Sequence, residues 1–184
     1  MTIDTKKLTY EAFLTLPETK QRYEVIDGEM IVMSPSPTPD HQRIALNLSL
    51  QLAPFIREHH LGELFIAPLD VLITRSPLQT RQPDLLFVST SRRAIIGPQQ
   101  IEGGPDLIIE ILSPSNTRAD MELKLQDYWQ VGVQECWLVS PEARSIEVIQ
   151  RGAEHFERSG LYGIGDMIVS GVLPNLHLRV EEIW

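Results

Sequence analysis

The chain is poor in cysteine, in long apolar stretches and in basic residues. Its 184 residues contain one cysteine, Cys136, which excludes an intramolecular disulfide and argues against a cysteine-based metal site. No run reaches the ~18 consecutive apolar residues that a membrane-spanning helix needs, and residues 1–7 lack the apolar core of a signal peptide. We therefore expect a cytoplasmic protein without a membrane partner, in which the Cys136 thiol fills the core.

The charge balance is acidic, with 16 Lys and Arg against 25 Asp and Glu and a net charge of −9. This balance excludes the broad basic surface that non-specific DNA-binding proteins carry. Four arginines flank the acidic motifs, and they either form a local basic patch or are separate surface residues: Arg81, Arg92, Arg93 and Arg118. The length and the 42% hydrophobic content predict one domain over residues 1–184.

The first sixty residues predict a hairpin and a long helix. Asp27-Gly28 lies between the strand-like runs 22–26 and 29–33, and this is the strongest short-range hairpin signal. Thr9 is expected to cap a short helix over 10–16. Proline-rich residues 34–39 predict an extended connector, after which Asp40 is expected to cap a helix over 41–60 that Pro54 kinks or ends.

The rest of the chain predicts a sheet with one crossover helix. Strands are expected over 64–66, 71–73, 85–88, 105–112, 135–139 and 145–149, with a helical turn over 91–96 and one or two closing strands in 167–184. Thr117 and Asp120 form a capping-box pattern that opens a helix running to Val131 and ending at Gly132. The strand–helix–strand unit at 105–139 implies a right-handed crossover and a locally parallel sheet.

A carboxylate in the middle of an apolar strand is the most informative feature. Glu110 lies in the run from Leu107 to Leu112, where an unpaired charge would cost several kcal/mol. Its partner is therefore expected to be a metal ion or the ammonium of Lys124 on the next helix. Alternation along the strand puts Asp106 on the same face as Glu110.

At this point the sequence resembles the Uma family of restriction-endonuclease-like proteins, which is assigned to the PD-(D/E)xK nuclease superfamily. The resemblance covers roughly residues 8 to 184 and rests on five segments: 23–29, 34–37 with His41 after it, 82–85, 105–114 and 124–137. It implies an α/β, restriction-endonuclease-like mixed β-sheet flanked by helices, with an N-terminal β-hairpin extension and a divalent metal, Mg²⁺ or Mn²⁺, at the active edge. Carried over, Asp84 is the Asp of "PD" and Glu110 is the acidic member of "(D/E)xK".

The sequence departs from the motif at its third position. Leu112 stands where the motif has lysine, and Lys124 resembles the migrated lysine of relatives in this superfamily. Asp84 and Glu110 are the expected metal ligands, because a hard cation such as Mg²⁺ binds one or two carboxylates and keeps several waters. Lys124 would orient the attacking water or stabilise the transition state, and Tyr128, one helical turn on, would position Lys124.

Each candidate residue also has a purely structural explanation. Asp84 could be a turn residue, Glu110 could pair with a core arginine, and Lys124 could pair with Asp120 on the helix surface. Glu24 either lines the site or decorates the hairpin surface, Asp106 either joins the site or caps the strand entry, and His41 either binds a ligand or is a solvated histidine at a helix start.

These observations predict a Mg²⁺-dependent endonuclease that hydrolyses phosphodiester bonds, with DNA as the substrate. Two alternatives stay open: a catalytically silent binding or scaffold protein of the same fold, favoured by Leu112 and the acidic charge, and a metal-dependent hydrolase of small phosphates, which suits the acidic surface better than DNA does. We also expect a homodimer, because a small domain cuts both strands of a duplex only with two sites or two turnovers, and C₂ pairing is the commonest oligomer.

Overall fold

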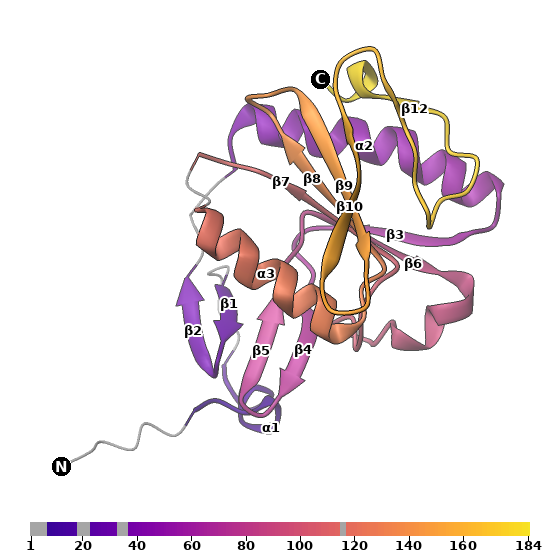
Figure 1. The fold of residues 1–184 in the computed structure, drawn as a ribbon. Coiled ribbons are helices and arrows are strands. Elements are labelled where there is room, and N and C mark those ends of the chain that lie inside the picture. Colours follow the sequence, from indigo (N-terminus) through magenta and orange to yellow (C-terminus); the bar gives the residue numbers. More distant parts are fainter. Residues whose placement is uncertain (1–6, 18–22, 33–36, 115–116) are drawn as a thin grey trace.

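The structure, a computed structural model, describes residues 7–17, 23–32, 37–114 and 117–184. Its centre is a six-stranded sheet with the order β10-β9-β8-β7-β6-β3 (Figure 1). The strands are β3 (Gly62–Ile66), β6 (Leu85–Ser89), β7 (Leu107–Ile111), β8 (Glu135–Ser140), β9 (Ser145–Arg151) and β10 (Phe156–Tyr162). In this sheet β7 and β8 pair in parallel and the other neighbours pair antiparallel, so the expected mixed sheet is confirmed.

The crossover between β7 and β8 is helix α3 (Arg118–Val131), as the sequence predicts. The capping box is present, because the Thr117 hydroxyl accepts from the Asp120 N–H and the Asp120 carboxylate accepts from the Thr117 N–H. Gly132 ends the helix with φ 99°, a left-handed conformation that glycine adopts without strain. These local signals fix where α3 begins and ends.

Two helices cover opposite faces of the sheet (Figure 1). Helix α2 (Pro39–Glu58) buries Ile44, Leu48, Leu52 and Ile56 against one face. Helix α3 lies on the other face, where Tyr128 packs in the same cluster as Ile108 and Cys136. The Cys136 thiol is fully buried, as expected of a core residue.

The structure corrects two expectations about α2, that Asp40 is its N-cap and that the helix could end at Pro54. Its N-cap is Thr38, whose hydroxyl accepts from the His41 N–H, and Asp40 lies inside the first turn. Pro39 takes the first helical position, where a missing N–H costs nothing. The helix also continues through Pro54 to Glu58. Because Leu50 and Pro54 lie on the exposed side, water can satisfy the carbonyl that Pro54 leaves without a donor.

The N-terminal part forms a small unit beside α3 (Figure 1). It contains α1 (Tyr10–Phe13), the hairpin of β1 (Tyr23–Ile26) and β2 (Glu29–Val32), and the pair β4 (Val71–Arg75) and β5 (Leu78–Arg81). The hairpin is confirmed, with positive φ at Asp27 and Gly28. Thr9 caps α1, which is shorter than predicted, while residues 22 and 33–36 lie outside the described residues.

The remaining elements are short. A 3₁₀ helix, η1 (Thr90–Ile95), follows β6 and confirms the predicted helical turn. The C-terminal segment contains β11 (Met167–Ile168), β12 (Leu178–Arg179) and η2 (Val180–Ile183), and β11 pairs with β12 instead of extending the main sheet. No helix in the described ranges has both the length and the apolar character needed to cross a bilayer.

Candidate active site

Two carboxylates face each other across neighbouring strands. Leu85 of β6 pairs with Ile109 of β7, and the antiparallel register therefore sets Asp84 opposite Glu110. Asp84 Oδ2 accepts from the Ile111 N–H at 2.8 Å, which fixes the Asp84 side chain against β7. Glu110 is 5% exposed, so the pair joins a partly open carboxylate to a buried one.

The ammonium that the sequence assigns to Glu110 is in place. Lys124 Nζ lies 3.1 Å from both Glu110 Oε1 and Glu110 Oε2, and the Tyr128 hydroxyl donates to Glu110 Oε1. The surface alternative for Lys124 is not what the structure has, because Asp120 is engaged by Thr117 in the capping box. The spacing of four residues puts Lys124 and Tyr128 on one face of α3.

Glu24 reaches the same cluster from the N-terminal hairpin. Its Oε1 lies 3.6 Å from Lys124 Nζ and accepts from the Gln82 N–H at 3.0 Å. The side chain is buried, so Glu24 is not a surface decoration of the hairpin. Lys124 therefore lies between two buried carboxylates, one from β1 and one from β7.

Sequence reasoning missed two members of this cluster, Arg81 and Asp127. Arg81 is 4% exposed, donates through NH1 to Glu24 Oε2 at 3.0 Å, and donates through Nε to Asp127 Oδ2 at 2.7 Å. Asp127 is also buried, one turn beyond Lys124 on α3. The only signal in the sequence was an acidic residue at a helix position that faces the core.

Of the two alternatives for the four arginines, the local basic patch is absent from the described residues. Arg81 is buried, Arg92 and Arg93 pair with Asp106 and Glu63 near η1, and exposed Arg118 pairs with Glu122 on α3. The four arginines therefore lie in three places, the buried cluster, η1 and the exposed side of α3. Their positions in the sequence flank the acidic motifs, but the fold does not gather them into one patch.

Asp106 and His41 have different positions relative to the cluster. Asp106 lies at the start of β7, where its carboxylate accepts from the Ser89 N–H at 2.7 Å and lies 3.7 Å from Arg92, so the structure does not bring it to Glu110. His41, in the first turn of α2, sets Nε2 3.1 Å from Asp84 Oδ1. His41 Nδ1 is buried and has no hydrogen-bond partner among the described residues.

Burial and charge act together on the protonation of the cluster. Burial raises the pKa of Glu110, Lys124 opposes that rise, and the charge of Asp84 adds to it. Burial also acts to lower the pKa of Lys124, but the carboxylates of Glu110 and Glu24 outweigh it and hold that pKa above its usual value. The carboxylates thus repel each other, and a cation between Asp84 and Glu110 would relieve this repulsion.

The donor set fits a hard divalent cation in an open site. An ionised carboxylate has about four acceptor positions, and the contacts from Lys124, Tyr128, Ile111 and His41 leave some free on both Glu110 and Asp84. No group of three or more His, Cys, Asp or Glu side chains in the described part of the chain is placed to hold a metal ion. Two carboxylates with coordinated waters are a common arrangement for Mg²⁺.

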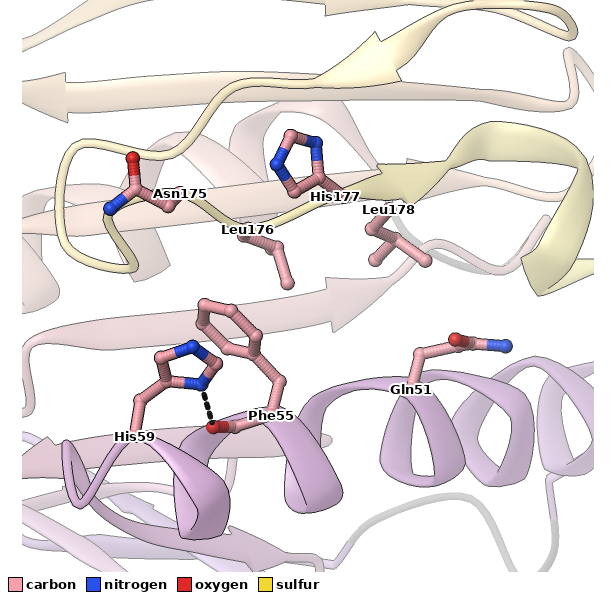
Figure 2. Close-up of a pocket in the computed structure, with 7 residues that line it drawn as sticks. All are labelled: Gln51, Phe55, His59, Asn175, Leu176, His177 and Leu178. Carbon is pink, nitrogen blue, oxygen red and sulfur yellow. Dashed lines mark hydrogen bonds between the residues drawn. The ribbon is translucent and has the colours of Figure 1, made fainter.

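Two hollows of the surface lie away from the cluster. Figure 2 shows one of about 320 Å³ between the end of α2 and the C-terminal segment, with Phe55 and His59 on one side and Leu176 and His177 on the other. A second, of about 500 Å³, lies among α2, β3 and η1. Neither is lined by Asp84, Glu110 or Lys124.

Comparisons with known proteins identify the fold and the family of the chain. No curated protein matches the chain. A solved structure from Anabaena variabilis, described as "a putative nuclease belonging to DUF820", superimposes with a TM-score of 0.76 at 22% identity, over 96% of this chain and 97% of that one, and confirms the fold. The family model described as "Putative restriction endonuclease" matches residues 10–181. The chain therefore belongs to the Uma2 family, as the resemblance of its motifs predicts.

Proposed function

We propose that this protein is a Mg²⁺-dependent nuclease that hydrolyses phosphodiester bonds in DNA. The nuclease class is supported by the family and by the structural neighbour. The observation that carries the proposal is the position of the Lys124 ammonium, 3.1 Å from the buried carboxylate of Glu110. Glu110 in turn lies opposite Asp84, at the start of the neighbouring strand. This set of groups is suited to a metal, an attacking water and a phosphate.

Each residue of the cluster has a role that follows from its contacts. Asp84 and Glu110 would hold the metal, which when bound would lower the pKa of an attacking water and neutralise charge on the phosphate oxygens. Lys124 would orient that water or stabilise charge that develops in the transition state. Tyr128 fixes the carboxylate of Glu110 by donating to Oε1. In this proposal Lys124 of α3 takes the role of the motif lysine, whose position is occupied by Leu112.

A cleavage assay tests the role of Lys124. Single- and double-stranded DNA would be incubated with Mg²⁺ and wild type, Glu110→Ala, Lys124→Ala or Lys7→Ala, the last being an exposed lysine paired with Asp27. Lys124→Ala is expected to lower turnover by on the order of 10² or more, because a positioned charge acts mainly on the transition state. Lys7→Ala should cleave like wild type. Equal cleavage by Lys124→Ala would reject the role of Lys124, and cleavage of no nucleic acid by wild type would favour the silent fold.

Calorimetry with Mn²⁺ tests the metal ligands separately. Asp84→Ala and Glu110→Ala are each expected to weaken binding severely, while Lys124→Ala leaves affinity largely intact. Asp106→Asn is the matched control, because Asp106 is a buried acid on the same segment that lies outside the cluster. Undiminished binding in both ligand variants would contradict the metal site.

One observation favours a second candidate, a hydrolase of small phosphate esters. In the described ranges every Lys and Arg except Arg57, Arg144 and Arg151 lies within 4.0 Å of a carboxylate, which leaves few free cations for a nucleic-acid backbone. Turnover of p-nitrophenyl phosphate with no cleavage of DNA would favour this candidate over the nuclease.

A further inference from the structure

Arg81 is a fully engaged cation in the middle of the cluster, yet the proposed chemistry gives it no task. We infer that Arg81 is a positioning residue, which holds the Lys124 ammonium against Glu110 by way of Glu24 and Asp127. This inference rests on the proposed nuclease function, because Lys124 is the residue whose position Arg81 controls. Two sets of contacts carry it.

The first set fixes helix α3. The Arg81 Nε and NH2 groups both contact Asp127 Oδ2, at 2.7 and 2.6 Å. Asp127 lies three residues after Lys124, so the two side chains leave neighbouring turns of one face of the helix. The two contacts from Arg81 to Asp127 therefore fix the rotation of α3 about its axis and its position along that axis, close to Lys124.

The second set controls the charge next to Lys124. Glu24 turns Oε2 to Arg81 NH1 at 3.0 Å and Oε1 to Lys124 Nζ at 3.6 Å, so one carboxylate is shared by two cations. Lys124 is closer to Glu110, at 3.1 Å. Without the guanidinium, the whole charge of Glu24 would act on Lys124 at low dielectric and draw it away from Glu110.

Only arginine has the geometry for this task. Its planar guanidinium presents donors in fixed directions to two carboxylates at once, whereas a lysine ammonium is a point charge on a flexible stem. Arg81 is also three residues before Asp84. The same short segment therefore anchors α3 at one end and supplies a proposed metal ligand at the other.

The test compares kcat, KM and metal affinity in four variants. Arg81→Lys keeps the positive charge but loses the planar set of guanidinium donors. Asp127→Asn removes the carboxylate charge that Arg81 contacts on α3, with little change in side-chain shape. Glu122→Gln is the matched control for the loss of an acid on α3, because its partner Arg118 is 93% exposed. Leu125→Ala, which trims a partly buried core contact of the same helix, controls for lost stability.

Arg81→Lys and Asp127→Asn are expected to lower kcat by on the order of 10², the effect of a catalytic group misplaced by about 1 Å. KM for DNA and the Mn²⁺ dissociation constant should stay within about twofold of wild type, since ground-state contacts are kept. Glu122→Gln should match wild type, and Leu125→Ala should lower the denaturation midpoint but keep kcat. A kcat loss that follows stability across all four variants, or unchanged kcat in Arg81→Lys and Asp127→Asn, would overturn the inference.

Crystal structures of Arg81→Lys and Asp127→Asn separate this inference from the proposed function. If wild type cleaves no nucleic acid, the nuclease proposal fails, and the distance from Lys124 Nζ to Glu110 then decides the role of Arg81. A distance beyond ~3.5 Å, the limit of a hydrogen bond, is the expected result in both variants. A distance that stays at 3.1 Å would overturn the role of Arg81 whatever the activity.

Discussion

At the scale of single residues, Asp70 borders the candidate site, and its ionised carboxylate lowers the stability of the folded protein mainly because it is buried. Burial raises the pKa of Asp70, the hydrogen bond from Gln82 opposes the rise, and the charge of Glu24 adds to it. The folded protein therefore binds this proton more tightly than the unfolded chain does. Stability falls as the pH rises from the ordinary Asp range through the raised pKa, and the full penalty is present at neutral pH.

We therefore expect Asp70→Asn to raise the urea midpoint at pH 7. The amide oxygen can still accept from Gln82 Nε2, which lies 2.9 Å from Asp70 Oδ1. The gain should disappear below the ordinary pKa of Asp, about 3.9, where the wild-type carboxyl is protonated in both states. Glu142→Gln, at an exposed turn, is the control and should change little. A variant less stable than wild type at pH 7 would contradict the assignment.

The sequence predicts those residues of the site that stand out within one short segment of the chain. Glu110 is recognisable in the sequence because it is an acidic residue within an apolar run. Lys124 is a candidate partner because a buried carboxylate needs a cation. Arg81 and Asp127 could not be paired in advance, because they are 46 residues apart and meet only when α3 packs on the sheet. Local patterns show that a charge is buried, but the partner depends on the tertiary fold.

At the scale of elements, the start of α3 depends on Thr117. Thr117→Ala removes the N-cap and is expected to lower the free energy of unfolding by about 1 kcal/mol. Arg118→Ala, which breaks an exposed pair on the next residue, should cost only a few tenths of a kcal/mol. Urea denaturation of both variants at neutral pH measures the difference, and equal midpoints would show that the cap contributes nothing.

The same variant has a defined pH dependence. The hydrogen bonds from the Thr117 side chain and backbone hold the pKa of Asp120 below its usual value. A lowered pKa contributes stability that is present above the ordinary Asp range and is lost as the pH falls through the lowered pKa. The stability difference between wild type and Thr117→Ala should therefore shrink in acid.

Helices and hairpins that are bounded by turn or cap residues can be predicted from the sequence, and strands without such residues cannot. The hairpin at Asp27-Gly28 and the limits of α3 follow from turn and cap residues. Strands β5 and β10 were missed, because β10 carries Glu157, Arg158 and Gly160 at the sheet edge and shows no apolar alternation. An edge strand is defined by hydrogen bonds to a neighbour, which composition does not reveal.

At the scale of the whole molecule, the paired surface cations predict a weak dependence of DNA affinity on salt. Each phosphate contact contributes a slope of about −0.9 to log K against log salt. Three described basic residues lack a carboxylate partner: Arg57, Arg144 and Arg151. Lys6, Lys20 and Arg22 lie outside the described residues and add at most three more contacts, so we expect a slope shallower than about −6 by fluorescence anisotropy with Glu110→Ala over a series of KCl concentrations. A slope of about −6 or steeper would reveal an extended phosphate-binding surface.

The prediction of a homodimer concerns the same scale. Two active sites would let the molecule cut both strands of a duplex in one encounter, and C₂ pairs are the commonest oligomers. Strand β10 ends the main sheet and offers an unpaired edge to a second copy. Light scattering at micromolar concentration should give twice the chain mass. A mass near 20.9 kDa would reject the dimer.

The crossover of α3 over the sheet has a consequence for how the molecule opens. If α3 detached, Glu110 would keep its place in the central strand β7 but lose both Lys124 and Tyr128, and the apolar residues that pack with Tyr128, such as Ile108, would be exposed to water at a cost in free energy. We therefore expect that the helix does not fray away from an intact sheet. Strand β7 and helix α3 should open as one cooperative unit, so that hydrogen exchange gives a common free energy for their most protected amide hydrogens.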